Sequence, residues 1–112
     1  MRAALVAAVA LAALAGDAGE ARAEFYSGDL LWDLCTTRGD ESQRACLGFI
    51  AAAADALSAQ EDGRRQACIP IDIRLGPVRD VVVAYLRAHP EDRYKTAISL
   101  AAAALAEAFP CR

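Results

Sequence analysis

The chain has 112 residues, a formal net charge of −3 at pH 7 and 56% apolar residues. This length suits one small domain. A mildly acidic chain without a Lys/Arg run lacks the electrostatic footprint of a nucleic-acid binder, so we expect no nucleic-acid partner. A single His and the absence of Asn narrow the options for an enzyme.

The first 23 residues have the three parts of a secretory signal peptide. Arg2 supplies a positive start, residues 3–15 form an uncharged apolar run, and residues 21–23 (Ala-Arg-Ala) match the pattern that signal peptidase cleaves. The apolar run is shorter than the ~20 residues that a membrane-spanning helix needs, which disfavours an uncleaved anchor. We therefore expect residues 24–112 to form the mature exported domain, with no membrane contact after cleavage.

All four cysteines lie in the expected mature region: Cys35, Cys46, Cys68 and Cys111. An even number of cysteines in a small exported domain predicts two disulfides. No pair has C-x-x-C spacing, and His89 is the only imidazole. Zinc and thioredoxin-like redox sites are therefore disfavoured, and we expect neither a metal nor a cofactor.

Hydrophobic periodicity predicts two helices in the first half of the mature chain. The first covers about residues 28–35, with Ser27 as its N-cap. Residues 36–44 are polar and contain a glycine, which favours a turn or loop. The second helix covers about residues 43–59.

A connector and a third helix follow. Residues 68–76 alternate isoleucine with polar residues, but with no second strand to pair with we expect an ordered connector. Pro77 suits the first turn of the third helix. This helix must end at His89 because Pro90 follows.

A fourth helix is predicted to begin at Pro90. Glu91 and Asp92 would then lie in its positive first turn, and Pro110 would end it. Its expected buried stripe is Tyr94, Ala97, Ile98, Ala101, Leu105, Ala108 and Phe109. The fold class is therefore all-α, a small four-helix bundle, or five helices if short turns are counted, stapled by two disulfides.

The expected topology also predicts the disulfide pairing. In an up-down-up-down bundle, the first and second helices meet at one pole, near Cys35 and Cys46. The start of the third helix and the end of the fourth meet at the other pole, near Cys68 and Cys111. We therefore favour Cys35–Cys46 and Cys68–Cys111 over the two other connectivities.

No residue set typical of an enzyme stands out. His89 precedes Pro90 at a turn between helices, where an N-cap or a solvent-exposed contact explains it better than base catalysis. The carboxylate pairs are adjacent in sequence, which is typical of solvated charge. We interpret Trp32 as a core anchor rather than an exposed binding residue because Leu31 and Leu34 border it. No enzymatic activity is expected.

A series of motifs runs through the mature chain. The most specific are the Tyr-Leu-x-x-His-Pro turn at residues 85–90 and the closing Ala-Phe-Pro-Cys at 108–111. The others are Phe25, Tyr26, Gly28, Leu30, Cys35, Cys46, Gly48, Phe49, Ile50, Asp55, Cys68, Pro70, Val81, Val82, Ala104 and Leu105. In this order they resemble the Rap/Tai-type immunity proteins, small periplasmic proteins that protect bacteria from the peptidoglycan-cutting effectors of type VI secretion.

The resemblance covers nearly all of residues 24–112 and implies a function. It implies a periplasmic immunity protein that binds a secreted cell-wall amidase and covers its catalytic cleft, and it raises homodimerisation. The alternative is a small periplasmic structural or chaperone-like protein without a dedicated toxin. A large exposed apolar patch would favour the alternative, whereas a charged, protruding patch would favour immunity.

The turn between the third and fourth helices is the candidate binding surface. It carries five charged or titratable side chains within seven residues: Arg87, His89, Glu91, Asp92 and Arg93. We expect them to form an exposed, rigid projection whose arginines contact the partner without contributing to folding. The alternative is that Glu91 and Asp92 only suit a helix dipole and that Arg87 and Arg93 only pair with them.

Overall fold

The computed structural model describes residues 25–59 and 65–112. The expected signal peptide, residues 1–23, lies outside the described residues. The described chain folds into four α-helices and one 3-10 turn, and beyond one isolated bridge it contains no strand. The elements are α2 (Gly28–Thr36), α3 (Asp40–Ser58), α4 (Leu75–Ala88), η1 (Pro90–Asp92) and α5 (Ala97–Ala108). The all-α prediction is confirmed.

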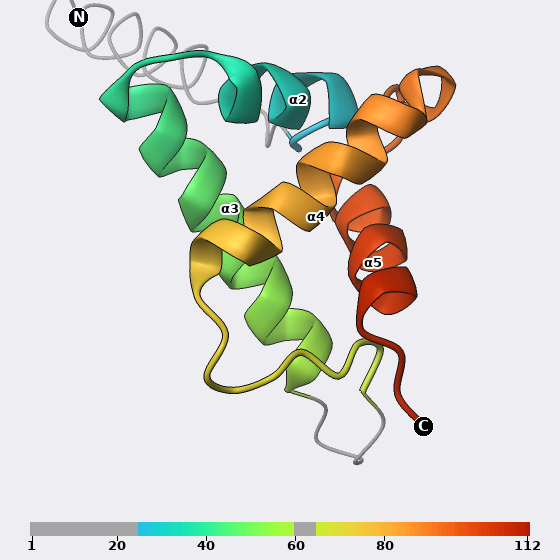
Figure 1. Ribbon diagram of the computed structural model, residues 1–112. Helices are drawn as coiled ribbons and strands as arrows, with labels where there is room; N and C mark the ends of the chain where they lie inside the picture. Colours follow the sequence, from blue (N-terminus) through green and yellow to red (C-terminus); the bar gives the residue numbers. More distant parts are fainter. Residues whose placement is uncertain (1–24, 60–64) are drawn as a thin grey trace, which may run out of the picture.

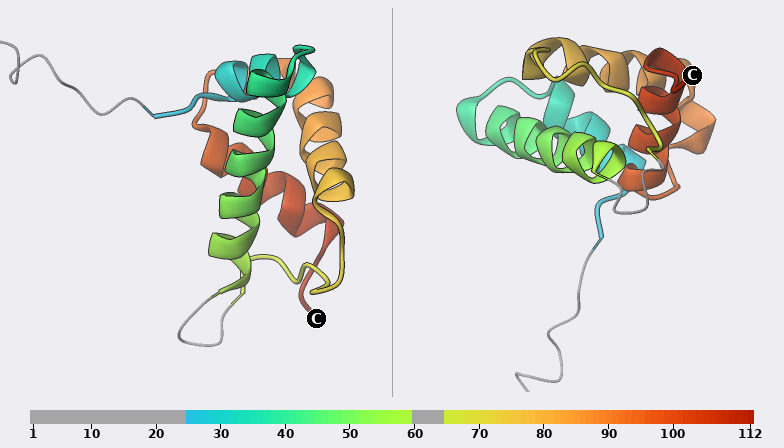
Figure 2. Two further views of the ribbon diagram at one scale, coloured as in Figure 1. Left: turned by 90° about the vertical axis from the view of Figure 1, so that its left-hand side faces the viewer. Right: turned by 90° about the horizontal axis from the view of Figure 1, so that it is seen from below.

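The four helices enclose one core, and α2 is oriented differently from the others. Helices α3 and α4 run in opposite directions side by side, and α5 descends beside them (Figures 1 and 2). Helix α2 crosses one end of this group rather than lying along it, and it touches α3, α4 and α5. The arrangement is therefore a three-helix group with a crossing fourth helix, not the regular up-down-up-down bundle that the sequence predicts.

The junction between α2 and α3 is shorter than predicted. The hydroxyl of Ser27 accepts a hydrogen bond from the Leu30 backbone nitrogen at 3.1 Å, which confirms the N-cap. Helix α3 already begins at Asp40, because Gly39 turns the chain with φ 131°. Asp40 and Glu41 then lie in the positive first turn. The prediction of a loop over residues 36–44 is therefore correct only for residues 37–39, and the rest of that range is helical.

Helix α4 has the boundaries that its prolines predict. It begins at Leu75, and Pro77 lies in its first turn, where no backbone hydrogen bond is lost. It ends with His89 as its C-cap, because the residue before a proline is disfavoured in helical conformation. Val78, Val82 and Leu86 form its buried face.

Helix α5 begins seven residues later than predicted. Residues 90–92 form only a 3-10 turn, and Thr96 is the N-cap, with its hydroxyl 3.4 Å from the Ser99 backbone nitrogen. The buried stripe is therefore Ala97, Leu100, Ala101, Ala104 and Leu105. Tyr94 and Ile98, predicted to be buried, are 74% and 45% exposed, and Ala108 is also exposed.

Every helix contributes apolar side chains to the core. The residues enclosed most completely, such as Leu31, Ile50 and Leu86, come from α2, α3 and α4. Alanines on α3 and α5 allow close helix packing. The core consists of Leu31, Cys35, Cys46, Ile50, Ala53, Leu57, Ala67, Val78, Val82, Leu86, Ala97, Leu100, Ala101, Ala104 and Leu105.

Both predicted disulfides are confirmed. Cys35–Cys46 joins α2 to α3, and Cys68–Cys111 joins the connector before α4 to the C-terminal segment after α5. The chain-entropy relation gives about 3 kcal/mol for the first loop and about 4 kcal/mol for the second. Total stabilities of small domains are only ~5–15 kcal/mol, so these links are a large share of the stability of this domain.

Candidate partner-binding site

The start of α2 is bound to residues 93–96, the link between η1 and α5. The Gly28 backbone nitrogen donates to the Lys95 carbonyl at 2.8 Å, and the Asp29 nitrogen donates to the Arg93 carbonyl at 2.8 Å. These bonds satisfy two of the donors that a helix N-terminus leaves open. The link is thereby held in place against α2.

Gly28 is required for this close approach. A side-chain carbon at Gly28 would lie 2.7 Å from the Arg93 carbonyl oxygen and 2.3 Å from a Leu100 methyl carbon. Real carbon atoms do not approach so closely, and a backbone carbonyl cannot move aside cheaply. Gly28 is therefore a packing requirement that local sequence patterns do not reveal.

His89 ends α4 and stiffens the candidate turn. Its backbone nitrogen and its ring Nδ1 both donate to the Tyr85 carbonyl, at 3.0 and 2.9 Å. Its ring also stacks on the Tyr85 ring, with centroids 4.1 Å apart. His89 therefore caps the C-terminus of α4. It also stands at the N-cap position of η1, but its side chain forms no N-cap hydrogen bond there, in contrast to the N-cap role expected from the sequence.

Two of the predicted binding residues gather around the indole of Trp32. The Arg93 guanidinium carbon lies 3.9 Å from the centroid of the Trp32 ring, and the Arg87 guanidinium carbon lies 5.8 Å from it. Arg93 also donates from Nε to the Leu86 carbonyl at 2.8 Å. We call Trp32, Arg87 and Arg93 the Trp32 cluster. Each cation–π contact contributes about 0.5–2 kcal/mol, depending on its exposure.

The acidic residues of the turn do not pair with its arginines. Asp92 accepts from the Lys95 ammonium at 3.2 Å, which raises the pKa of Lys95, and Glu91 is exposed. Among residues 25–59 and 65–112, neither arginine of the Trp32 cluster forms an ion pair. In the described residues, Arg87 and Arg93 therefore form no ion pair with Glu91 or Asp92.

The five predicted residues share one turn but differ in exposure. Arg87 and Glu91 are exposed, whereas His89, Asp92 and Arg93 are half-buried. Arg93 thus differs from the freely exposed charge expected from the sequence, because it packs on an aromatic ring. Trp32 is half-buried too and packs against the edge of the core.

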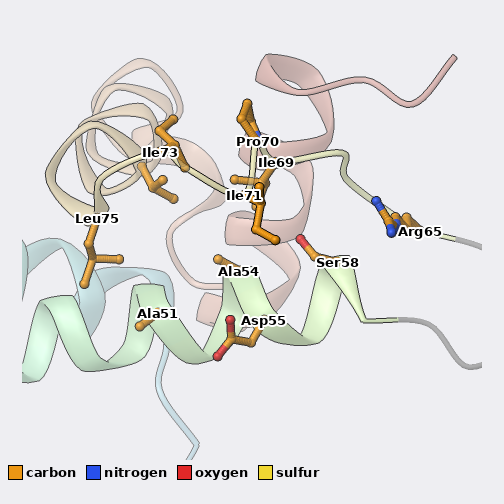
Figure 3. Close-up of a pocket in the computed structure, with 11 residues that line it drawn as sticks. Ala51, Ala54, Asp55, Ser58, Arg65, Ile69, Pro70, Ile71, Ile73 and Leu75 are labelled. Atoms are coloured by element: carbon orange, nitrogen blue, oxygen red, sulfur yellow. The ribbon is translucent and has the colours of Figure 1, made fainter.

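Hollows lie between the described elements, and one of them borders this turn. A cavity of about 370 Å³ between α4 and α5 is lined by side chains that include Tyr85, His89 and Glu107. A groove of about 430 Å³ lies between α3 and the connector (Figure 3). Connector isoleucines stand over small residues of α3 there, and Ile71 is fully exposed.

The described residues do not gather metal ligands. Within residues 25–59 and 65–112, no three His, Cys, Asp or Glu side chains form a set that could hold a metal ion. No helix in the same ranges is both long and apolar enough to cross a membrane. The chemical character of the candidate site is therefore that of a charged, partly aromatic surface.

Comparison with known proteins places the chain in a family. No curated protein matches the chain. A family model described as Rap1a immunity proteins matches residues 27–111, from the N-cap of α2 to the last cysteine. The match includes all four helices, both disulfides and the Trp32 cluster. The chain therefore belongs to the family of Rap1a immunity proteins.

Proposed function

We propose that residues 24–112 form a periplasmic immunity protein that binds a type VI secretion peptidoglycan amidase and occludes its catalytic cleft. Family membership supports immunity by binding a partner protein. The observation that carries the proposal further is the turn around η1, whose exposed charges are held on packed helices. Arg87 lies in the last turn of α4, Glu91 follows in η1, and neither side chain contributes to the core.

Rigidity supports inhibition by simple binding. Two disulfides brace the domain, and the stacked His89 and Tyr85 rings fix the turn. A surface that is already ordered avoids the entropic cost of ordering side chains and loops on association. Such a protein blocks a cleft by occupying it and needs no catalytic groups of its own.

The disulfides also support an oxidising compartment. Disulfides persist in the periplasm and are rare in the cytosol, where thiols are kept reduced. The predicted signal peptide at residues 1–23 points to the same compartment. Periplasmic placement would also put the protein where a cell-wall amidase acts.

The proposal is tested by titrating an amidase with the mature, oxidised protein. The first partner to try is a secreted cell-wall hydrolase encoded by an adjacent gene. Hydrolysis of purified peptidoglycan should fall in proportion to the added protein and reach zero at a fixed molar ratio. The protein should be recovered chemically unchanged, because it binds and does not react.

An unrelated muramidase serves as the control and should keep its full activity. Undiminished amidase activity with a molar excess of the protein would contradict occlusion. Broad capture of unfolded clients would instead favour the periplasmic chaperone-like alternative. The implied homodimer is a separate prediction, checked by the molar mass of the purified protein in solution.

A further inference from the structure

We propose that the Trp32 cluster is a receptor for one acidic side chain of the partner protein. This inference rests on the proposed function, since it names the chemistry by which the same face would recognise its partner. It follows from the way in which α2, α4 and the link before α5 bring two guanidinium groups to one indole ring.

Arg93 is fixed in a geometry that leaves one side of its guanidinium group open. Its Nε–H is bound to the Leu86 carbonyl, and its guanidinium carbon lies over the Trp32 ring, 3.9 Å from the centroid. Within residues 25–59 and 65–112, its two terminal nitrogens have no protein acceptor. A carboxylate can accept two parallel hydrogen bonds from these two nitrogens.

Arg87 adds a second positive charge beside the same ring. It is exposed and lies in the last turn of α4, and its side chain approaches the indole of Trp32 on the neighbouring helix α2. Two like charges near one ring repel each other unless an anion lies between them or beside them. A carboxylate from a partner would supply that anion and would be held by both arginines.

The acidic residues around the cluster do not already fill this role. Asp92 is bound to Lys95. Asp29 contacts Arg93 through main-chain atoms, and its carboxylate makes no ion pair with Arg87 or Arg93 in the described part of the chain. The two arginines therefore keep an uncompensated charge on a protein whose net charge is −3.

The same acidic neighbours favour a single carboxylate over an extended polyanion. Asp29, Glu91 and Asp92 lie in the elements around the cluster and would repel a phosphate backbone or an anionic lipid surface. A lone Asp or Glu side chain on a protein surface can reach between the arginines without approaching these acids. The indole adds an apolar wall that lowers local solvation and strengthens the ion pair.

The main experiment compares matched arginine variants in binding to the amidase. Arg87→Gln removes an exposed charge of the cluster, and Arg74→Gln removes an exposed charge at the opposite end of α4. Arg87→Gln should raise the Kd more than tenfold and reduce its dependence on salt concentration, and Arg74→Gln should change neither. Equal Kd values for Arg87→Gln and the wild type would overturn the receptor.

A second arm needs no amidase, because Trp32 is the only tryptophan of the chain. The oxidised protein is titrated with acetyl-Gly-Glu-Gly-amide and with its uncharged match acetyl-Gly-Gln-Gly-amide. Trp32 fluorescence and the NMR signal of Arg93 Nε–H should change with the Glu peptide alone, and Arg87→Gln should abolish that change. Even if no amidase binds, identical responses to the Glu and Gln peptides would overturn the proposed carboxylate receptor.

The two arms separate the two proposals. Binding of the Glu peptide without binding of any amidase would contradict the proposed function and support the receptor. Tight amidase binding that Arg87→Gln leaves unchanged would do the reverse. Inorganic phosphate or vesicles of anionic lipid that bind more tightly than the Glu peptide would overturn the choice of a protein carboxylate.

Discussion

Two places in this molecule join segments that are far apart in the sequence, and they do so by different means. At one, the start of α2 binds the link before α5 through main-chain hydrogen bonds such as Gly28 to Lys95. At the other, the connector before α4 is tied to the C-terminal segment by the Cys68–Cys111 disulfide and by one hydrogen bond from Cys68 to Phe109.

The difference lies in what each join requires of its residues. The α2 junction depends on close packing, since Gly28 leaves no space for a side chain. The connector has no regular structure, borders an open groove and relies on a covalent bond. The packed junction also carries the Trp32 cluster, so precise packing accompanies the proposed binding face.

The largest effect should come from breaking the covalent join. Replacing Cys68 and Cys111 together by Ser opens the longer loop, so we expect a loss of about 4 kcal/mol. The melting temperature should fall by tens of degrees, because 1 kcal/mol shifts it by about 4–8 °C in a domain of this size. The melting temperature is measured by recording circular dichroism during thermal unfolding.

Replacing Cys35 and Cys46 together is the matched comparison. Its loop is shorter, and the expected loss is about 3 kcal/mol. An unchanged melting temperature in the Cys68/Cys111 variant would show that the core alone holds the connector. A larger loss in the Cys35/Cys46 variant would show that packing, rather than loop length, decides the order.

The next effect should come from filling the packed junction. Gly28→Ala places a methyl group against the Arg93 carbonyl, and overpacking of this kind costs about 1–3 kcal/mol. Gly48→Ala is the control, because Gly48 lies in the interior of α3 with open space around it. There alanine should stabilise the helix by about 0.5–1 kcal/mol. Chemical denaturation of both variants should therefore give changes of opposite sign, and a neutral Gly28→Ala would contradict the close approach.

The smallest effects concern the two arginines on Trp32. Arg93→Gln removes the guanidinium that lies over the Trp32 ring and its bond to the Leu86 carbonyl, so we expect a loss of about 1–2 kcal/mol. Arg87→Gln should change the stability by less than about 0.5 kcal/mol, as is usual for exposed positions. Equal losses in the two variants would mean that Arg93 is not anchored as described.

Local sequence rules predict the parts of the fold that local chemistry decides. Ser27 caps α2, and Pro90 ends α4 at His89, as the sequence indicates. The disulfide pairing is also predicted, although α2 crosses the end of the other helices, because Cys35 and Cys46 still flank one short turn and the segment before α4 still meets the segment after α5. The N-cap at Thr96 is missed, because Pro90 offers a competing helix start.

Tertiary contacts decide the rest. Residues 93–96 stay non-helical because they bind the chain at the start of α2, and no local pattern reveals that partner. The Arg93–Trp32 contact joins residues that are 61 positions apart, so the sequence places both arginines on the turn but misses the ring that holds them. The requirement for Gly28 is hidden for the same reason.

The central claim is that the face formed by the η1 turn and the Trp32 cluster covers the cleft of an amidase. Hydrogen exchange measured by mass spectrometry on the amidase complex, compared with the free protein, tests it most directly. We predict slower exchange in residues 86–97 and in α2 around Trp32, with unchanged exchange in residues 65–75. Protection confined to the groove between α3 and the connector, with none around Trp32, would contradict this account.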